Sequence, residues 1–185
     1  MWIAIVIIVV VLLGLFFVVG FNRLRKQDVG VNEALGGIDV QLTRRADLIP
    51  NLVNTVKGYA AHEKGVFEAV TEARAGVQKA AADGTVPEKA AAQAALDKAI
   101  FNVLAVAEAY PELKASANFL ELQQQLAETE NQLAFARQYY NDAAAQLNTS
   151  ITTIPWMFFA GFTGVTKKEF YEAPAAAQTP PTVQF

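Results

Sequence analysis

The pattern of hydrophobic positions begins with an uninterrupted apolar stretch. No residue from Met1 to Phe21 carries a charged side chain, and Ile, Val, Leu and Phe dominate the run. A helix of this length is about 31 Å long, which matches the hydrocarbon thickness of a bilayer. A cleaved signal peptide is the alternative, but such a peptide has basic residues in front of a shorter apolar core. We therefore predict a retained transmembrane helix over residues 1–22.

Beyond this stretch, apolar residues recur every three or four positions, which is typical of helices that bury one face. The first such segment covers residues 31–49, and a bend is expected at Gly36 and Gly37 because glycine weakens a helix. Pro50 should break or kink the chain, since it lacks the N–H of a helical hydrogen bond. A second helix is then expected over residues 51–82.

The second half of the chain has the most regular period. Residues 83–87 predict a loop in which Thr85 caps a third helix over residues 87–110, and Pro111 interrupts that helix. A fourth helix is predicted over residues 113–154. Its apolar positions form a seam with the spacing of coiled coils, and the polar Thr129 within it is expected to fix the register. The seam consists of Phe119, Leu122, Leu126, Thr129, Leu133, Ala136, Tyr140, Ala143, Leu147, Ile151 and Ile154.

These elements together predict an all-α protein. We expect an N-terminal transmembrane helix, an antiparallel bundle of long helices and an extended C-terminal tail, because long helices joined by short loops pack in this way. The expected division is a membrane anchor over residues 1–22, a bundle domain over 23–154, and an aromatic segment with a Pro- and Ala-rich tail over 155–185. A tail of this composition has low intrinsic order.

Composition narrows the chemistry that the chain can carry. The net charge is only −3 and there is no cysteine, which argues against a nucleic-acid partner and excludes disulfides and thiolate sites. His62 is the one histidine, and Val66 stands where the second zinc ligand of an H-E-x-x-H motif would lie. No phosphate-binding loop or nucleophile elbow is present either. We predict no catalytic residue, no metal site, no cofactor and no enzyme activity.

A basic cluster follows the apolar stretch. Arg23, Arg25 and Lys26 lie directly after it, and basic residues beside a membrane helix favour the cytoplasmic side. We therefore expect a single-pass protein of the bacterial inner membrane, with Met1 outside and the bundle in the cytoplasm. These three side chains are also expected to contact anionic lipid head groups.

A charged stretch of the first bundle helix is the candidate partner surface. It carries Asp39, Arg44, Arg45, Asp47 and Asn51. Two cations beside an acid could bind an anionic lipid head group or a carboxylate of a protein partner. The alternative, which we favour, is an ion pair within the helix, because Asp47 follows Arg44 by three positions and charge runs usually lie on a solvated face.

An aromatic segment follows the fourth helix and contains Trp156, Phe158, Phe159 and Phe162. Aromatic side chains gather at membrane interfaces, so this segment could dip into the lipid surface. It could equally cover the open end of the bundle core. The pattern favours neither interpretation over the other.

Several ordered motifs, spread over nearly the whole chain, resemble those of the LemA family of bacterial membrane-anchored helical proteins. They are IDVQLTRRADLIPNLV at 38–53, VKGYA at 56–60, AEAYPELK at 107–114, NF at 118–119 with Leu122, TEN at 129–131, ARQYYND at 136–142 and PTVQF at 181–185. Gly36 and Gly37 depart from the bulkier residues that are frequent there in the family. The resemblance implies an N-terminal membrane helix, a bundle of long helices and no known catalytic activity. It also implies kinship with proteins of magnetosome vesicle formation and with proteins found beside membrane proteases.

Two functional hypotheses follow. The leading one is a non-enzymatic scaffold that self-assembles on the membrane and organises or remodels it, with lipids and further copies of the chain as partners. The other is an adaptor that binds or regulates a membrane protein such as a protease. A closed assembly of the first kind needs a heterologous interface, which the C-terminal tail could supply by adding an edge strand to a neighbouring copy.

Overall fold

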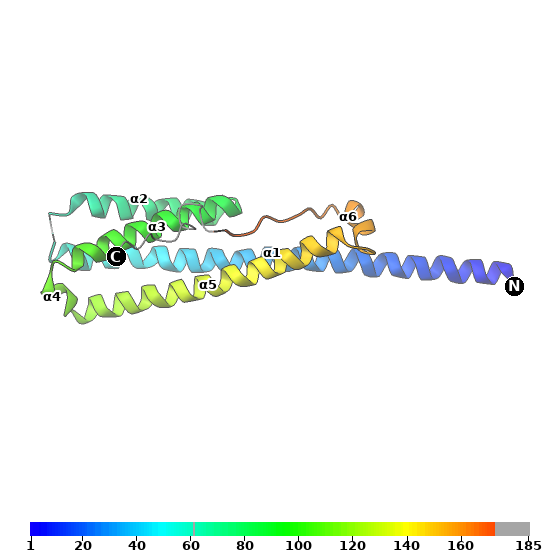
Figure 1. The fold of residues 1–185 in the computed structure, drawn as a ribbon, viewed down its shortest axis with the longest axis horizontal. Helices are drawn as coiled ribbons and strands as arrows, with labels where there is room; N and C mark the ends of the chain where they lie inside the picture. Colours follow the sequence, from blue (N-terminus) through cyan, green and yellow to red (C-terminus); the bar gives the residue numbers. More distant parts are fainter. Residues whose placement is uncertain (61, 173–185) are drawn as a thin grey trace, which may run out of the picture. The chain divides into compact units, whose positions relative to one another are not determined.

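The computed structural model describes residues 1–60 and 62–172, and this part of the chain is helical with no β-strand. The all-α prediction is confirmed. Figure 1 labels the described helices α1 to α6, of which α2 and α3 lie side by side. They are α1 (Trp2–Lys57), α2 (Lys64–Asp83), α3 (Val86–Ala107), α4 (Pro111–Lys114), α5 (Ala117–Thr152) and α6 (Met157–Thr163).

The chain forms two compact units, and α1 and α5 each contribute to both. The first unit, called here the anchor unit, comprises Met1–Gly36 and Gln138–Phe170. The second, called here the bundle unit, comprises Gly37–Arg137 and Tyr171–Phe185, of which the structure describes Tyr171 and Glu172 beyond α5. The functional division predicted at residues 22 and 154 stays a prediction.

The core of the bundle unit consists of apolar side chains at helical spacing on four helices. In α1 the buried positions recur three or four residues apart, so one face of the helix is covered by its neighbours. Fully or nearly fully buried are Ile38, Leu42, Ala46, Ile49, Leu52 and Val56 of α1, Phe67, Val70 and Val77 of α2, Leu96, Ile100 and Val103 of α3, and Phe119, Leu126 and Leu133 of α5.

The predicted break at Pro50 is wrong, because α1 continues through it to Lys57. A proline in a helix leaves the carbonyl four residues earlier without its N–H partner. Here that carbonyl belongs to Ala46, and the Nε–H of Arg74 on α2 donates to it at 3.0 Å. A side chain from another helix thus replaces the missing backbone donor. Helix α1 ends at Lys57, so the second helix begins at Lys64 rather than at residue 51.

The loop before α3 and the interruption at Pro111 are confirmed. The carboxylate of Glu88 accepts hydrogen bonds from the backbone N–H of Thr85 at 2.7 Å and from its hydroxyl at 2.9 Å. The bond from the Thr85 N–H to the Glu88 side chain belongs to a capping box at the start of α3. Pro87 lies in the first turn of this helix. Hydrogen bonding to the carboxylate lowers the pKa of Glu88. Helix α3 ends at Ala107, and Pro111 begins the one-turn helix α4.

The predicted seam of α5 is largely buried. Phe119, Leu126, Thr129, Leu133, Tyr140 and Leu147 are each at most 5% exposed. The prediction is wrong for the last residue of the seam, because Ile154 lies beyond α5 and is 73% exposed. The hydroxyl of the buried Thr129 has a hydrogen-bond partner within its own helix, since it donates to the carbonyl of Leu126 at 2.9 Å. Its role in fixing the register stays a prediction.

In the anchor unit, an extended segment follows α6 and is held by α5. Gly164 adopts a left-handed conformation with φ of 67°, which lets the chain reverse direction after the helix. The side-chain amide of Asn148 then donates to the carbonyl of Lys168 at 2.9 Å and accepts from its N–H at 2.8 Å. The hydroxyl of Tyr140 donates to the carbonyl of Glu169 at 2.8 Å. This segment, residues 165–170, is called the strap below. The C-terminal tail that could add a strand to a neighbouring copy lies outside the described residues from residue 173 on.

Two described helices are long and apolar enough to cross a membrane, α1 and α3. They differ in burial. In the most apolar stretch of α1 only 6% of the residues are buried, whereas 39% are buried in α3. Since the buried face of α3 is part of the bundle core, α1 is the candidate for a membrane span. Membrane association through an N-terminal helix is therefore supported.

Candidate functional surfaces

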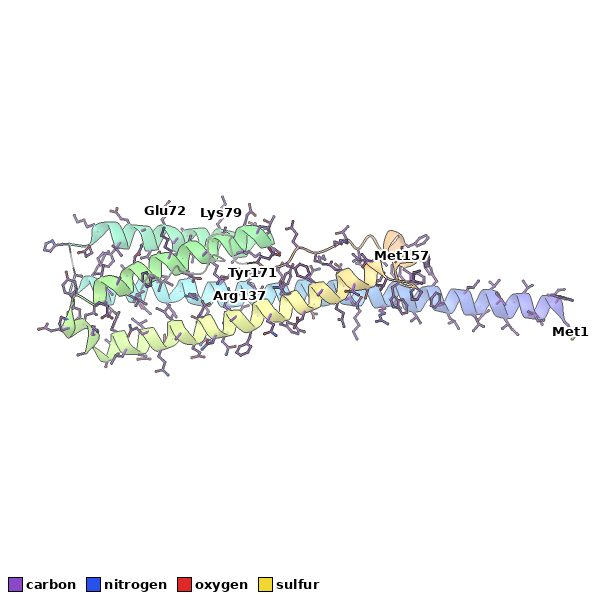
Figure 2. All side chains as sticks on the ribbon, in the orientation of Figure 1. Met1, Glu72, Lys79, Arg137, Met157 and Tyr171 are labelled. Carbon is purple, nitrogen blue, oxygen red and sulfur yellow. The ribbon has the colours of Figure 1, made fainter. Side chains whose placement is uncertain are left out.

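An aromatic cluster joins α6 to the end of the apolar stretch of α1. The ring of Phe159 lies 5.3 Å from that of Phe16 and 5.7 Å from that of Phe17, both edge-on. The ring of Phe162 lies 5.5 Å from that of Phe17. Such edge-to-face pairs stabilise contacts beyond the area they bury. Figure 2 labels Met157 on the same short helix.

The predicted membrane-surface cations are all exposed, and two of them have partners. The guanidinium of Arg23 lies 4.5 Å from the ring centre of Trp156, within the range of a cation–π contact. Arg25 pairs with Asp28 at 3.7 Å. The structure thus places one predicted basic residue against one predicted aromatic residue. Contact of these residues and of Lys26 with lipid stays a prediction.

Arg45 does not belong to an exposed partner surface, and that prediction is wrong. Its side chain is 8% exposed and forms ion pairs with Glu130 and, at 3.0 Å, with Asp97. Glu130 also pairs with Arg137 at 3.2 Å. Burial lowers the pKa of Arg45 below its ordinary value, and the charge of Asp97 opposes this shift. Arg45 therefore joins α1, α3 and α5 in the interior of the bundle unit.

The polar network continues to the residue after the strap. Gln93 donates from Nε2 to Asp97 at 3.3 Å, and its Oε1 accepts from the hydroxyl of Tyr171 at 2.9 Å. Figure 2 labels Tyr171 and Arg137, which lie near one another. Burial is the main cause that raises the pKa of Tyr171. Sequence reasoning missed this network, although Gln93 lies three and seven positions before the apolar Leu96 and Ile100 and so shares their buried face.

Asp39, Arg44 and Asp47 do lie together, on an outward face of α1. They line a shallow depression of about 540 Å³ with Val40, Thr43 and Leu48. The predicted pairing of Arg44 within its helix is replaced by a pair with Glu128 of α5 at 3.7 Å, in which both side chains are half exposed. Asp39 pairs at 2.5 Å with the buried Lys89.

Asn51 lies apart from that depression. It lines a polar hollow of about 330 Å³ between α1 and α5. The other lining residues are Asn54, Thr55, Asn118, Glu121, Leu122 and Gln125. Asn51 and Asn118 come from two different motifs of the sequence, so the fold brings these two motifs to one place.

The described residues contain no group of three or more His, Cys, Asp or Glu side chains that could hold a metal ion. His62 is exposed in the turn after α1. Glu128 and Glu130 point to different partners, Arg44 and Arg45, as expected for residues two apart on a helix.

Comparison with known proteins gives a family and several relatives. The model of the LemA family matches residues 34–185. "Magnetosome protein MamQ 2" of Paramagnetospirillum magneticum is 28% identical over 165 residues, which cover 77% of this chain and 61% of the relative. "Magnetosome protein MamQ" of Magnetospirillum gryphiswaldense is 25% identical with the same coverage. The chain spans 61% of the length of these curated relatives. Since the family match covers most of its length, the chain belongs to the LemA family.

Proposed function

We propose that the protein is a non-enzymatic, membrane-anchored scaffold that self-assembles on the bacterial inner membrane and organises or remodels it. The observation that carries this proposal is the contrast within α1. Its apolar first stretch is almost wholly exposed, while the same helix supplies a buried stripe to the bundle unit. Apolar side chains in such numbers need lipid around them. The names of the two relatives describe no reaction.

The orientation in the proposal follows from charge. Arg23, Arg25 and Lys26 are exposed directly after the apolar stretch, and basic residues at this place favour the cytoplasmic side. The bundle unit then lies in the cytoplasm, where it can meet other copies of the chain and other proteins.

Self-assembly is supported by large apolar side chains that remain outside the core of the bundle unit. Phe101 of α3 and Phe135 of α5 are 70% and 67% exposed, and Val40 of α1 is exposed within the charged depression. Apolar groups of this size are enriched where protein surfaces meet. We propose that they take part in contacts between copies.

The test is the mass of the full-length protein in mild detergent, measured by light scattering, together with electron micrographs of the same sample. A large and uniform assembly supports the scaffold. Phe135→Ser should reduce its mass, whereas the control Gln124→Ser, at an exposed polar position of α5, should leave it unchanged. A strictly monomeric protein at high concentration contradicts self-assembly.

An adaptor function is the second candidate, and the depression on α1 favours it. Asp39, Arg44 and Asp47 present both signs of charge around the exposed Val40, a combination suited to a specific protein partner. A photo-crosslinking residue at Val40 tests this in cells. Recovery of a membrane protein that is lost in the double variant R44E/D47K supports the adaptor. Recovery of the chain itself alone contradicts it.

A further inference from the structure

We propose that α6 is a second membrane contact, lying in the boundary between head groups and acyl chains beside the point where α1 leaves the bilayer. The inference rests on the proposed membrane anchoring through α1. The partner is a lipid surface, and the side chains that meet it are Ile154, Met157, Phe158 and Phe162.

The depth of α6 follows from its contacts with the anchor. The rings of Phe159 and Phe162 contact Phe16 and Phe17, which lie four and five residues before Phe21, the last residue of the uncharged stretch. At the rise of an α-helix this places the contact about 6–8 Å inside the apolar boundary. Amphipathic helices that lie in a membrane surface reach a depth of about 5–10 Å. The two depths agree.

The packing of α6 on α1 is close and leaves a second apolar face uncovered. Phe159 is 5% exposed and lies against Gly20, where an added Cβ would come within 2.6 Å of two carbon atoms of the Phe159 ring. Phe158 remains 64% exposed, and Phe162, whose ring touches Phe17 along one edge, remains 71% exposed. Because the neighbouring stretch of α1 is itself surrounded by lipid in the proposed arrangement, the uncovered face continues the lipid-contacting surface of the anchor.

The charges around α6 mark where the lipid ends. No residue from Ala143 to Thr166 carries a charge, so insertion of α6 carries no ionised group into the bilayer, where it would be costly. The guanidinium of Arg23 lies over the ring of Trp156, and tryptophan is enriched at the level of the head groups. Lys168, just after α6, pairs with Asp28 at 2.7 Å. Charged side chains thus follow the apolar region both on α1 and on the strap.

The test uses the absence of cysteine from the chain. Single substitutions Phe158→Cys and Phe162→Cys carry a spin label in the full-length protein, reconstituted in vesicles of phosphatidylcholine and phosphatidylglycerol. Collisions with oxygen report lipid, and collisions with a water-soluble nickel complex report solvent. Leu12→Cys is the control within the anchor, and Lys167→Cys is the control in water.

The expected result is a ratio of oxygen to nickel accessibility at Phe158 and Phe162 that is several-fold above the ratio at Lys167 and below that at Leu12. A ratio equal to that of Lys167, with Leu12 in lipid, overturns the inference and leaves the anchor standing. Shielding from both reagents also overturns it, because it means that protein, such as a second copy, covers the face. A solvent-like ratio at Leu12 contradicts the proposed anchoring itself.

A second measurement keeps α6 unaltered. In the variant Trp2→Phe, Trp156 is the only tryptophan, and its fluorescence is recorded in vesicles that contain brominated lipids. Quenching should be stronger for bromine near the head group than for bromine near the end of the acyl chain. Absence of quenching from either position, in protein of unchanged helix content, overturns the inference.

Discussion

A single residue of a neighbouring helix replaces the backbone hydrogen bond that Pro50 removes from α1. Pro50 removes one backbone donor, and Arg74 supplies another to the carbonyl of Ala46. The sequence predicted a break because proline acts within its own helix, whereas the compensation comes from a residue on the next helix. No spacing rule along α1 can reveal such a partner.

This compensation predicts a coupling between Pro50 and Arg74. Arg74→Leu should lower the free energy of unfolding by about 1–2 kcal/mol, because it leaves a carbonyl without a hydrogen bond to a charged donor. In a Pro50→Ala background the backbone N–H is restored, so Arg74→Leu should lower the free energy of unfolding by much less. Urea unfolding of the four proteins of this double-mutant cycle in detergent measures the coupling. Equal costs of Arg74→Leu in the two backgrounds would show that the bond to Ala46 contributes nothing.

Arg44 and Arg45 are adjacent, yet the fold gives them opposite environments. Arg45 lies seven residues after Ile38 and four before Ile49, so it shares the buried stripe of α1. Its position in the period of α1 agrees with burial, which the charge of the side chain alone does not indicate. Which acids would meet it was beyond prediction, since Asp97 and Glu130 come from distant helices.

Substitution of Arg45 and of Arg44 by the same residue allows a matched comparison of stability. Arg45→Met should lower the free energy of unfolding by about 2–3 kcal/mol, because Asp97 and Glu130 lose their cation, although both reach solvent in part. Arg44→Met removes an exposed ion pair and should cost less than about 1 kcal/mol. Thermal unfolding followed by circular dichroism compares the two variants. A similar loss in both would contradict a structural role for the buried network.

At the scale of elements, the helices were predictable and the strap was not. Period and capping residues located α3 and α5, whose ends differ by a few residues from those predicted. The strap has no periodic pattern. Side chains of α5 hold it by hydrogen bonds to the backbone of the strap. Backbone atoms carry no sequence signal, so such contacts cannot be derived from residue types.

The strap should open when its amide contact is removed. Asn148 makes two hydrogen bonds to the backbone of Lys168, and each contributes about 1 kcal/mol. Asn148→Ala should therefore raise the rate of trypsin cleavage at Lys167 and Lys168 by about an order of magnitude or more. The control Thr149→Ala changes an exposed neighbour and should leave the rate unaltered. Identical cleavage rates in the two variants would show that other contacts hold the strap.

At the scale of the whole molecule, the sequence predicted the family and the general architecture. The residues that form the candidate surfaces could be identified only from the folded structure. The aromatic segment illustrates the difference. Its composition permitted either a lipid contact or a bundle cap, and its contacts with Phe16 and Phe17 place it beside the anchor. Likewise, Asp39, Arg44 and Asp47 line the depression on α1, whereas Arg45 is buried in the bundle unit and does not line it.

The basic cluster should determine the orientation of the chain in the membrane. In spheroplasts, a cysteine at Glu112→Cys should react with an impermeant maleimide only after lysis, since basic residues beside a membrane helix favour the cytoplasmic side. Reversal of Arg23, Arg25 and Lys26 to Glu should increase labelling before lysis. Reversal of Lys64, Lys79 and Lys98, which lie on α2 and α3, is the control and should have no effect. Labelling of the unmodified cluster before lysis would place the bundle unit outside.

The contact of Phe159 with Gly20 has a consequence for the balance between the two leaflets. It holds α6 beside one end of the apolar stretch only, so every copy that inserts α6 adds cross-sectional area to a single leaflet. The opposite leaflet receives α1 alone. A dense array of copies would therefore expand one monolayer relative to the other, and the bilayer would relieve this mismatch by bulging toward the side on which α6 lies.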